Sequence, residues 1–304
     1  MLSIFLIFFI IFFSIGSIFS QDKNFFCPID QPNLSITSTF GESRKDHFHV
    51  GVDISKEDLY VFPIQSGKIL YYEFEGMHSR RFLSGSGNQV WLDHGMGFWS
   101  GYFHLKKFFS PDKGIFINLK ESFALTGNTG RSYGAHLHFF IFSDYGKKAV
   151  NPLSFVSCLE KDEVPPEIEY IAFLVPDGGQ MKIQSVVPNI VQELRLKQKR
   201  PLYVKVIDYN NQKRIPRMPY KIEWFFENTL EVKHSFLTFD YLENTKEGFL
   251  LNGKYKFQDL YFKDLLYLDT FNYVNGENKI TIIAYDYHNH STKKTFYMFI
   301  KKEY

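Results

Sequence analysis

The sequence predicts an all-β protein in which an antiparallel β domain is followed by a β-sandwich domain. From residue 37 to about residue 156, short apolar runs alternate with glycine-rich turns. A second series of strand-like segments follows a charged, proline-containing stretch, and no long segment shows clean helical periodicity. A length of 304 residues agrees with two domains or with one large domain.

The chain begins with an apolar segment that predicts export. Residues 4–13 are ten uninterrupted apolar residues, and small residues follow as far as Ser20. This order is typical of a secretory signal peptide, which we place at residues 1–20. Because no Lys or Arg precedes the apolar run, an uncleaved N-terminal anchor stays open as the alternative. No second apolar segment is long enough to cross a membrane, so membrane association is expected only through this segment.

The charge balance argues against nucleic acid as a partner. The net charge is +2, from 35 basic and 33 acidic residues, and no long basic run occurs. A nucleic-acid-binding domain normally carries a strongly basic face or stripe. Aromatic residues make up 18% of the chain, which fits either a compositional bias or a functional aromatic surface.

The first domain is predicted over residues 21–158. Two apolar runs flank Ser66-Gly67, a strand–turn–strand unit has its turn at residues 94–97, and the glycine-rich loop of "ALTGNTGRSYGAHLHFFIF" leads into another strand. Cys27 and Cys158 bracket this region. In an oxidising compartment they can form one disulfide, but two unpaired thiols remain the alternative because spacing alone does not give their distance.

A linker is predicted at residues 159–166, where "CLEKDEVPPEIEY" combines a charged run with two prolines. Residues 167–304 are predicted to form a β-sandwich, with one weak helical stretch near Pro188–Leu196. The strand candidates are Ile168–Val175, Leu202–Ile207, Tyr220–Phe226, Lys279–Tyr285 and Thr295–Ile300.

The histidines are concentrated in the first domain, where seven of the ten lie between residues 47 and 138. Three patterns stand out there: His49-x-Gly-x-Asp53, Tyr-Phe-His104-Leu, and His136-Leu-His138. On a strand, alternate residues share a face, so His49 and Asp53 are expected on one side and His136 and His138 likewise. A glycine at position 51 is expected to leave open space between the polar groups.

Imidazole nitrogens and a carboxylate point to zinc chemistry. A catalytic zinc site commonly has three protein ligands and leaves the fourth position to water. Two histidines and one carboxylate match that count, and further histidines would be free to move protons or to stabilise an oxyanion. A single His-x-His pattern is weak by itself. We therefore interpret the remaining histidines as structural or surface residues: His47, His78, His94, His234, and His288 with His290 in a turn-like stretch.

The segment from about Gly41 to Leu153 resembles the lysostaphin/LytM-type zinc endopeptidases, which cut peptide bonds in bacterial peptidoglycan. The matching blocks occur in the family's order along more than a third of the chain, which makes the resemblance specific. They are "RKDHFHVGVDI", "FPIQSGKI", "GNQVWLDHG", "YFHL", "GNTGRSYGAHLHF" and "VNPLSF".

The resemblance implies a role for each residue of the motifs. His49 and Asp53 match the first two zinc ligands, and His138 matches the third. His136 matches the catalytic histidine that is usually written as the general base. His104 matches a second active-site histidine that positions water or stabilises the tetrahedral intermediate. How the two share the base and stabiliser roles stays open.

Several further positions match or depart from the family pattern. Arg44 and Asn128 match recurrent residues around the cleft. Phe140 stands where members often have Glu, and we expect it to change contacts around the ligands but not the metal. Tyr133 and Phe103 replace residues that are often smaller, and we expect them to narrow the cleft.

The resemblance also implies a fold and a function. It implies a duplicated-hybrid-motif-like sheet, a Zn²⁺ cofactor, and an exported endopeptidase that acts on peptidoglycan stems or cross-links in the periplasm or cell envelope. The alternative is a catalytically silent relative that regulates cell-wall amidases, or a wall-binding scaffold. The second domain resembles the Ig-like β-sandwich tails of such peptidases. Wall binding, binding of a protein regulator and capping of the cleft are open roles for it.

Overall fold

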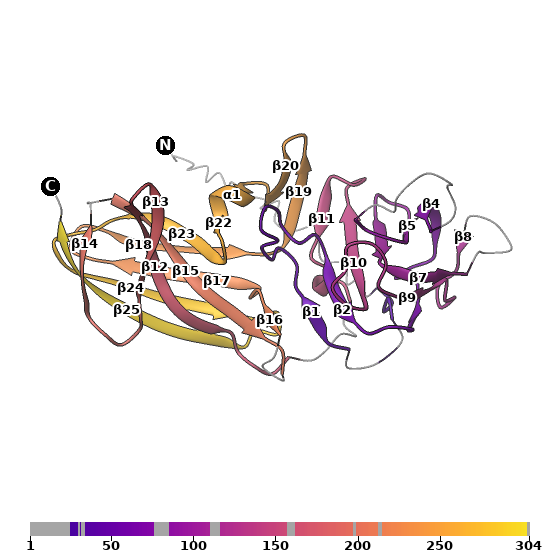
Figure 1. Cartoon of the computed structure of the whole chain (residues 1–304), viewed down its shortest axis with the longest axis horizontal. Coiled ribbons are helices and arrows are strands. Elements are labelled where there is room, and N and C mark those ends of the chain that lie inside the picture. The colour runs from indigo at the N-terminus through magenta and orange to yellow at the C-terminus, as the bar shows by residue number, and fades with distance from the viewer. Residues whose placement is uncertain are drawn as a thin grey trace, which may run out of the picture.

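A computed structural model describes residues 25–29, 31, 34–75, 85–109, 116–156, 162–196, 199–211 and 215–302 (Figure 1). Strands dominate these residues, and only α1 (Phe257–Leu260) and a 3-10 turn at Pro152–Ser154 are helical. The predicted all-β fold is confirmed. The apolar N-terminal segment and Cys158 lie outside the described residues, so the signal peptide and the disulfide stay predictions. Within the described part of the chain, no helix has the length and apolarity needed to span a bilayer.

The first domain is built on a large, mainly antiparallel sheet centred on β10 (His136–Ser143). The order of its strands is β21-β20-β19-β11-β10-β6-β5-β4-β8, and β2 pairs with β10 and with β1. A smaller sheet has the order β3-β9-β7. The strands are β1 (Ile36–Ser38), β2 (Val52–Ser55), β3 (Tyr60–Val61), β4 (Gly67–Glu73), β5 (Gln89–Asp93), β6 (Trp99–Phe103), β7 (Leu105–Phe108), β8 (Phe116–Ile117), β9 (Ala124–Thr126), β11 (Lys148–Val150), β19 (Tyr241–Thr245), β20 (Gly248–Leu251) and β21 (Tyr255–Lys256).

The register of β10 places polar side chains together on one face. In the antiparallel β2–β10 pair, His138 lies opposite Asp53. On the other side of β10, His138 lies opposite Phe103 of β6. Side chains directly opposite each other across antiparallel strands point to the same face. Residues 85 positions apart in the sequence therefore become neighbours.

The other face of these strands is apolar and packs into the core of the first domain. Val52, Ile54, Leu137, Phe139 and Ile141 are fully buried there. Burying each such side chain contributes roughly 1.5–3 kcal/mol to the free energy of unfolding. The alternation of apolar and polar residues along β10 thus fixes which face carries the histidines, because a shift of one residue would bury them instead.

Residues 47–51 are not part of a continuous strand, which corrects the expected alternation there. The strand begins only at Val52, and Gly51 has a φ of +131°. A Cβ atom on Gly51 would lie 2.5 Å from the backbone oxygen of Phe139. The glycine therefore permits a bend and a close approach to β10, and does not leave room for an ion. Phe48 and Val52, on either side of this bend, belong to two different apolar cores.

The second domain is a sandwich of two sheets (Figure 1). One has the order β13-β12-β15-β23-β22, with β16 on β15, and the other has the order β14-β25-β24-β17-β18. The strands are β12 (Glu167–Asp177), β13 (Gln180–Val186), β14 (Gln192–Leu196), β15 (Lys199–Tyr209), β16 (Pro216–Arg217), β17 (Lys221–Glu227), β18 (Val232–Thr238), β22 (Tyr261–Phe262), β23 (Leu265–Asn272), β24 (Gly276–Tyr285) and β25 (Ser291–Lys302).

Each of the five predicted strands of this domain is present, but the weak helix near Pro188–Leu196 is wrong. Residues Gln192–Leu196 form β14, which pairs in parallel with β25. Leu194 and Leu196 are buried while Arg195 between them is exposed, which is the period of a strand. His288 and His290 lie in the turn between β24 and β25, as predicted.

One hairpin from the second half of the chain extends the first sheet. β19 pairs with β11, with Leu242 opposite Ala149, and β20 pairs with β19. Figure 1 shows this hairpin between the two halves of the molecule. The predicted segments 21–158, 159–166 and 167–304 stay predictions. The sheet of the first segment also contains strands that follow the predicted linker in the sequence.

We expect Gly51→Ala to lower the free energy of unfolding by roughly 2–4 kcal/mol, because its backbone angle is strained for other residues and its Cβ would meet β10. Urea unfolding measures this change. Gly134→Ala is the matched control, since no atom lies within 4 Å of the added Cβ. Equal losses in the two variants would contradict this account of Gly51.

Candidate active site

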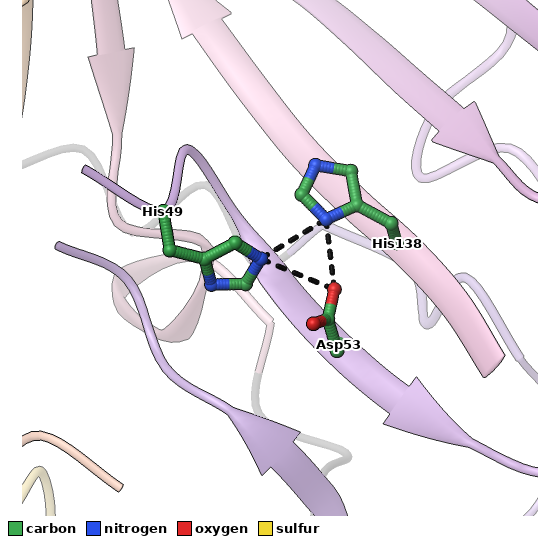
Figure 2. Close-up of side chains that lie close together, drawn as sticks. All are labelled: His49, Asp53 and His138. Carbon is green, nitrogen blue, oxygen red and sulfur yellow. Dashed lines mark hydrogen bonds and ion pairs between the residues drawn. The ribbon is translucent and has the colours of Figure 1, made fainter. Parts of the chain in front are cut away.

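Two imidazole nitrogens and one carboxylate oxygen, each able to ligate a metal ion, lie close together (Figure 2). Nε2 of His49 lies 3.1 Å from Oδ1 of Asp53 and 3.1 Å from Nδ1 of His138. The Nδ1 atom of His138 lies 2.8 Å from the same carboxylate oxygen. Among the described residues, this is the one group of three or more His, Cys, Asp or Glu side chains close enough to share a metal ion. The structure thus brings together the three predicted ligands.

His49 is held by a backbone carbonyl. Its Nδ1 atom lies 2.8 Å from the carbonyl oxygen of Thr39, and the side chain is buried. Because a carbonyl oxygen only accepts, Nδ1 must carry the hydrogen, and the lone pair is left on Nε2. Nε2 is the atom that faces Asp53 and His138. This hydrogen bond therefore sets both the tautomer and the ring orientation that a metal ligand requires.

Asp53 is held in a complementary way by Arg44. The Arg44 Nη2 atom donates to Oδ2 of Asp53 at 2.7 Å, so Oδ1 remains for the two histidines. Burial alone would raise the pKa of Asp53, but its close contacts with His49 and His138 outweigh burial, and the net pKa lies well below its usual value. Arg44, expected only somewhere around the cleft, therefore contacts a predicted ligand directly.

A buried polar network continues behind Arg44. Its Nη2 atom also donates to the Ser38 hydroxyl at 2.5 Å, and Ser38 in turn hydrogen-bonds Glu42. Burial raises the pKa of Glu42. Sequence reasoning missed Ser38, Thr39 and Glu42. The Ser38 hydroxyl lies 3.2 Å from Nδ1 of His49, whereas Thr39 acts through its backbone oxygen and Glu42 through Ser38. The only indication of these residues in the sequence was their position shortly before the motif block "RKDHFHVGVDI".

His138 stands on β10 and is placed by the strand register described above. Burial lowers the pKa of His138 to about 4. The imidazole is therefore neutral near pH 7, which is the form that binds a metal. The ring of Phe103 lies 5.4 Å from the His138 ring, centroid to centroid, and the ring of Phe140 lies 5.7 Å from it.

His104 reaches the site from the end of β6. It has a left-handed φ of +61°, which is uncommon for a residue other than glycine and is often found at functional sites. Its Nδ1 atom lies 2.8 Å from the carbonyl oxygen of Thr129, so the lone pair is on Nε2. Burial is the main cause that lowers the pKa of His104. The residue is therefore neutral near pH 7 and able to accept a proton.

His136 lies beside both His104 and Asp53. The centroids of the His104 and His136 rings are 4.7 Å apart, and Nε2 of His136 lies 3.7 Å from Oδ1 of Asp53. Nδ1 of His136 lies 2.7 Å from the carbonyl oxygen of Gly134, which again leaves the lone pair on Nε2. All five predicted site residues are thus gathered in one place, although their roles stay predictions.

The donor set fits zinc. Two imidazole nitrogens and one carboxylate oxygen converge, and the hydrogen bonds to Thr39 and Arg44 orient two of the three ligands. Such a set is typical of catalytic zinc sites that keep one position for water. His49, Asp53 and His138 would hold the ion. His104 and His136 would lie beside the remaining position.

The residues that depart from the family pattern occupy different environments. Phe140 is buried, and its ring packs against Trp91 and Phe103 at centroid distances of 4.7 and 4.8 Å. Tyr133 is fully exposed, so the expectation that it narrows the cleft stays a prediction. Asn128 is exposed in the loop between β9 and β10.

Most of the other histidines have ordinary structural partners. His78 lies outside the described residues. Those that the structure describes are accounted for as follows: His47 is exposed and contacts Asp46 at 2.6 Å, His94 contacts the Ser100 hydroxyl at 2.7 Å, His234 stacks on Phe225 at a centroid distance of 4.2 Å, the backbone N–H of His288 donates to Oδ1 of Asp286 at 2.7 Å, and the His290 ring contacts Asp286 at 2.7 Å.

Comparisons with known proteins agree with this site. The sequence model of peptidase family M23 matches residues 47–152. A protein of Buchnera aphidicola subsp. Baizongia pistaciae named "Uncharacterized metalloprotease" is 28% identical over 138 residues, which are 44% of this chain and 33% of that protein. The match therefore spans about a third of the relative's length.

Solved structures also match part of the chain. A zinc-containing peptidase from Vibrio cholerae is 25% identical with a TM-score of 0.35, covering 45% of this chain and 39% of that one. The catalytic domain of lysostaphin from Staphylococcus simulans is 25% identical with a TM-score of 0.33, covering 40% of this chain and 91% of that domain.

We expect one zinc ion to bind per chain, and Asp53→Ala to weaken its affinity by at least about 100-fold, because a charged ligand is lost. Competition with a chromogenic chelator measures the affinity. His290→Ala is the control, since it removes a histidine from the other His-x-His pattern. Equal losses in both variants would show that the ion binds elsewhere.

Proposed function

We propose that this protein is an exported zinc endopeptidase that hydrolyses peptide bonds in peptidoglycan stems or cross-links, and the match of residues 47–152 to the sequence model of peptidase family M23 supports this. The single observation that carries the proposal is the convergence of five side chains. Three present ligand atoms to one point, and two further histidines stand beside it with Nδ1 held by a backbone carbonyl and Nε2 free for proton transfer.

The site residues suit amide hydrolysis. When bound, zinc polarises the scissile carbonyl and lowers the pKa of bound water from about 16 toward about 7. His104 or His136 accepts the water proton at Nε2 and later donates it to the leaving amine. The Nδ1–H bonds to backbone carbonyls keep both rings aimed at the reacting atoms throughout. The partner histidine stabilises the developing oxyanion when it carries a proton on Nε2.

Different observations support the substrate and the location. The order of the motif blocks between Gly41 and Leu153 supports peptidoglycan peptides as substrate, since they resemble those of enzymes that cut them. The apolar run at residues 4–13 supports export to the periplasm or cell envelope. The balanced charge argues against nucleic acid as partner.

The test is incubation of zinc-loaded protein with purified cross-linked muropeptides, with products identified by mass. We expect new fragments that result from hydrolysis of a peptide bond, and their masses will identify the bond. No cleavage of any cross-linked species at full zinc occupancy would overturn the enzymatic proposal and favour the silent regulator.

We expect His136→Ala and His104→Ala each to lower kcat by roughly 10²–10⁴-fold, because each removes a group for proton transfer or charge stabilisation. Both variants should keep zinc, since neither residue is a ligand in this proposal. Zinc content and muropeptide turnover are measured on the same samples. Loss of zinc from His136→Ala would show that the division between ligand and base is wrong.

The lowered pKa of His104 predicts where activity declines in acid. If His104 is the residue that accepts the proton, it must be neutral, and its lowered pKa keeps it neutral to a more acidic pH than the usual value of about 6.5. The acid limb of kcat/KM should therefore lie below about pH 6.5. Zinc occupancy is checked at each pH. An acid limb above that value in fully loaded protein would contradict this prediction.

A further inference from the structure

The residue that orients His49 is itself bound by the second domain. The Thr39 carbonyl accepts the hydrogen of His49 Nδ1 at 2.8 Å. The Thr39 hydroxyl donates to the backbone oxygen of Met218 at 3.1 Å and accepts from the Met218 N–H at 3.0 Å. Met218 follows β16 in the sandwich. A single residue therefore connects the predicted first ligand to the other domain.

A second contact holds the same segment two residues later. The buried Tyr261 hydroxyl donates to the carbonyl oxygen of Gly41 at 2.9 Å. The ring of Phe239 lies against Gly41, so that a Cβ atom there would be only 2.4 Å from the ring. Both aromatic residues belong to the second half of the chain, and they fix the position of this backbone.

The segment is also anchored through apolar side chains. Phe40 and Phe48 are buried in the core that includes the sandwich residues, whereas β2 packs in the core of the first domain. The Phe48 ring lies 5.3 Å from Phe257 and 6.0 Å from Tyr261, centroid to centroid. Phe48 directly precedes His49, so this packing fixes the backbone from which the ligand projects.

The segment has little regular structure of its own. Residues 39–49, here called the ligand loop, lie between β1 and β2 and form only an isolated bridge, Ser43 to Phe48. Within the loop, Gly41 N–H donates to the His49 carbonyl at 2.9 Å, and His49 N–H donates to the Glu42 carbonyl at 2.8 Å. These bonds close the loop on itself, but its attachment to a rigid body comes from the second domain.

We propose that the C-terminal sandwich positions the metal site, by holding the ligand loop so that His49 points its Nε2 atom at Asp53 and His138. The inference rests on the proposed zinc function, which it deepens by assigning a role to the second domain. Groups that orient a ligand from behind typically change metal affinity by about 10–100-fold when removed. Thr39 and Tyr261 are positioning residues in this scheme, because neither has a side chain that would touch the ion.

The test removes the two hydroxyl groups in the full-length protein. We expect Thr39→Val to weaken zinc affinity about 10-fold, Tyr261→Phe to weaken it less, and the double variant to weaken it most. Thr39→Ser, which keeps the hydroxyl, should restore the affinity. The visible spectrum of the cobalt-substituted protein should change in Thr39→Val and not in Thr39→Ser, because it reports the ligand geometry.

Matched controls separate positioning from a general loss of stability. Thr281→Val and Tyr267→Phe remove hydroxyl groups that bond within the sandwich, to Thr295 and Thr270, away from the ligand loop. Ile282→Val opens a small cavity in the sandwich core and lowers stability without removing a hydrogen bond to the loop. All three should bind zinc with unaltered affinity at a temperature well below unfolding.

The outcomes distinguish this inference from the proposed function. Unaltered zinc affinity and cobalt spectrum in the double variant, with normal zinc binding by the original protein, would overturn the inference alone. Equal weakening in Thr39→Val and Ile282→Val would also overturn it, because the effect would then follow stability. Failure of the original protein to bind zinc would overturn both the function and the inference.

Discussion

The site depends on the antiparallel pairing of β2 with β10. This pairing sets Asp53 opposite His138 and places His136 two residues away on the same face. The apolar residues on the opposite face lock the register, because slipping by one position would expose Leu137 and Phe139 and bury the histidines. The positions of the site residues are thus fixed by buried apolar side chains that are not themselves part of the site. Gly51 is required for the same pairing, because it lets the chain bend directly before β2 and approach β10 closely.

Around this pair, the protein repeatedly uses backbone carbonyls to orient imidazole rings. Thr39, Thr129 and Gly134 each accept a hydrogen from Nδ1 of a histidine. Each bond leaves an Nε2 lone pair facing the site. A carbonyl cannot donate, so it fixes the tautomer without ambiguity and adds no titrating group. This explains how three histidines that crowd together can all remain competent to bind a metal or accept a proton.

Much of the site could be predicted from the sequence, because motif order and strand alternation carry the information. His136 and His138 alternate with buried residues as the strand period requires. The prediction that His49 lies on a continuous strand was wrong, because the bend at Gly51 depends on backbone angles that the apolar pattern does not encode. Thr39 could not be found, because its backbone oxygen performs the task and every residue has one. β14 was mistaken for a helix because a short polar stretch with two leucines fits both periods.

Through the pairing of β11 with β19, the sheet of the first domain depends on a hairpin from the second half of the chain. A protein shortened after residue 158 would keep every predicted ligand but would leave β11 with a row of unpaired N–H and C=O groups. An open edge of this kind is a template for pairing with another chain. The hairpin therefore also covers this edge and prevents it from pairing with another chain. Because the hydrogen bonding of the sheet continues to β21, a fragment that ends after the last motif block lacks this cover.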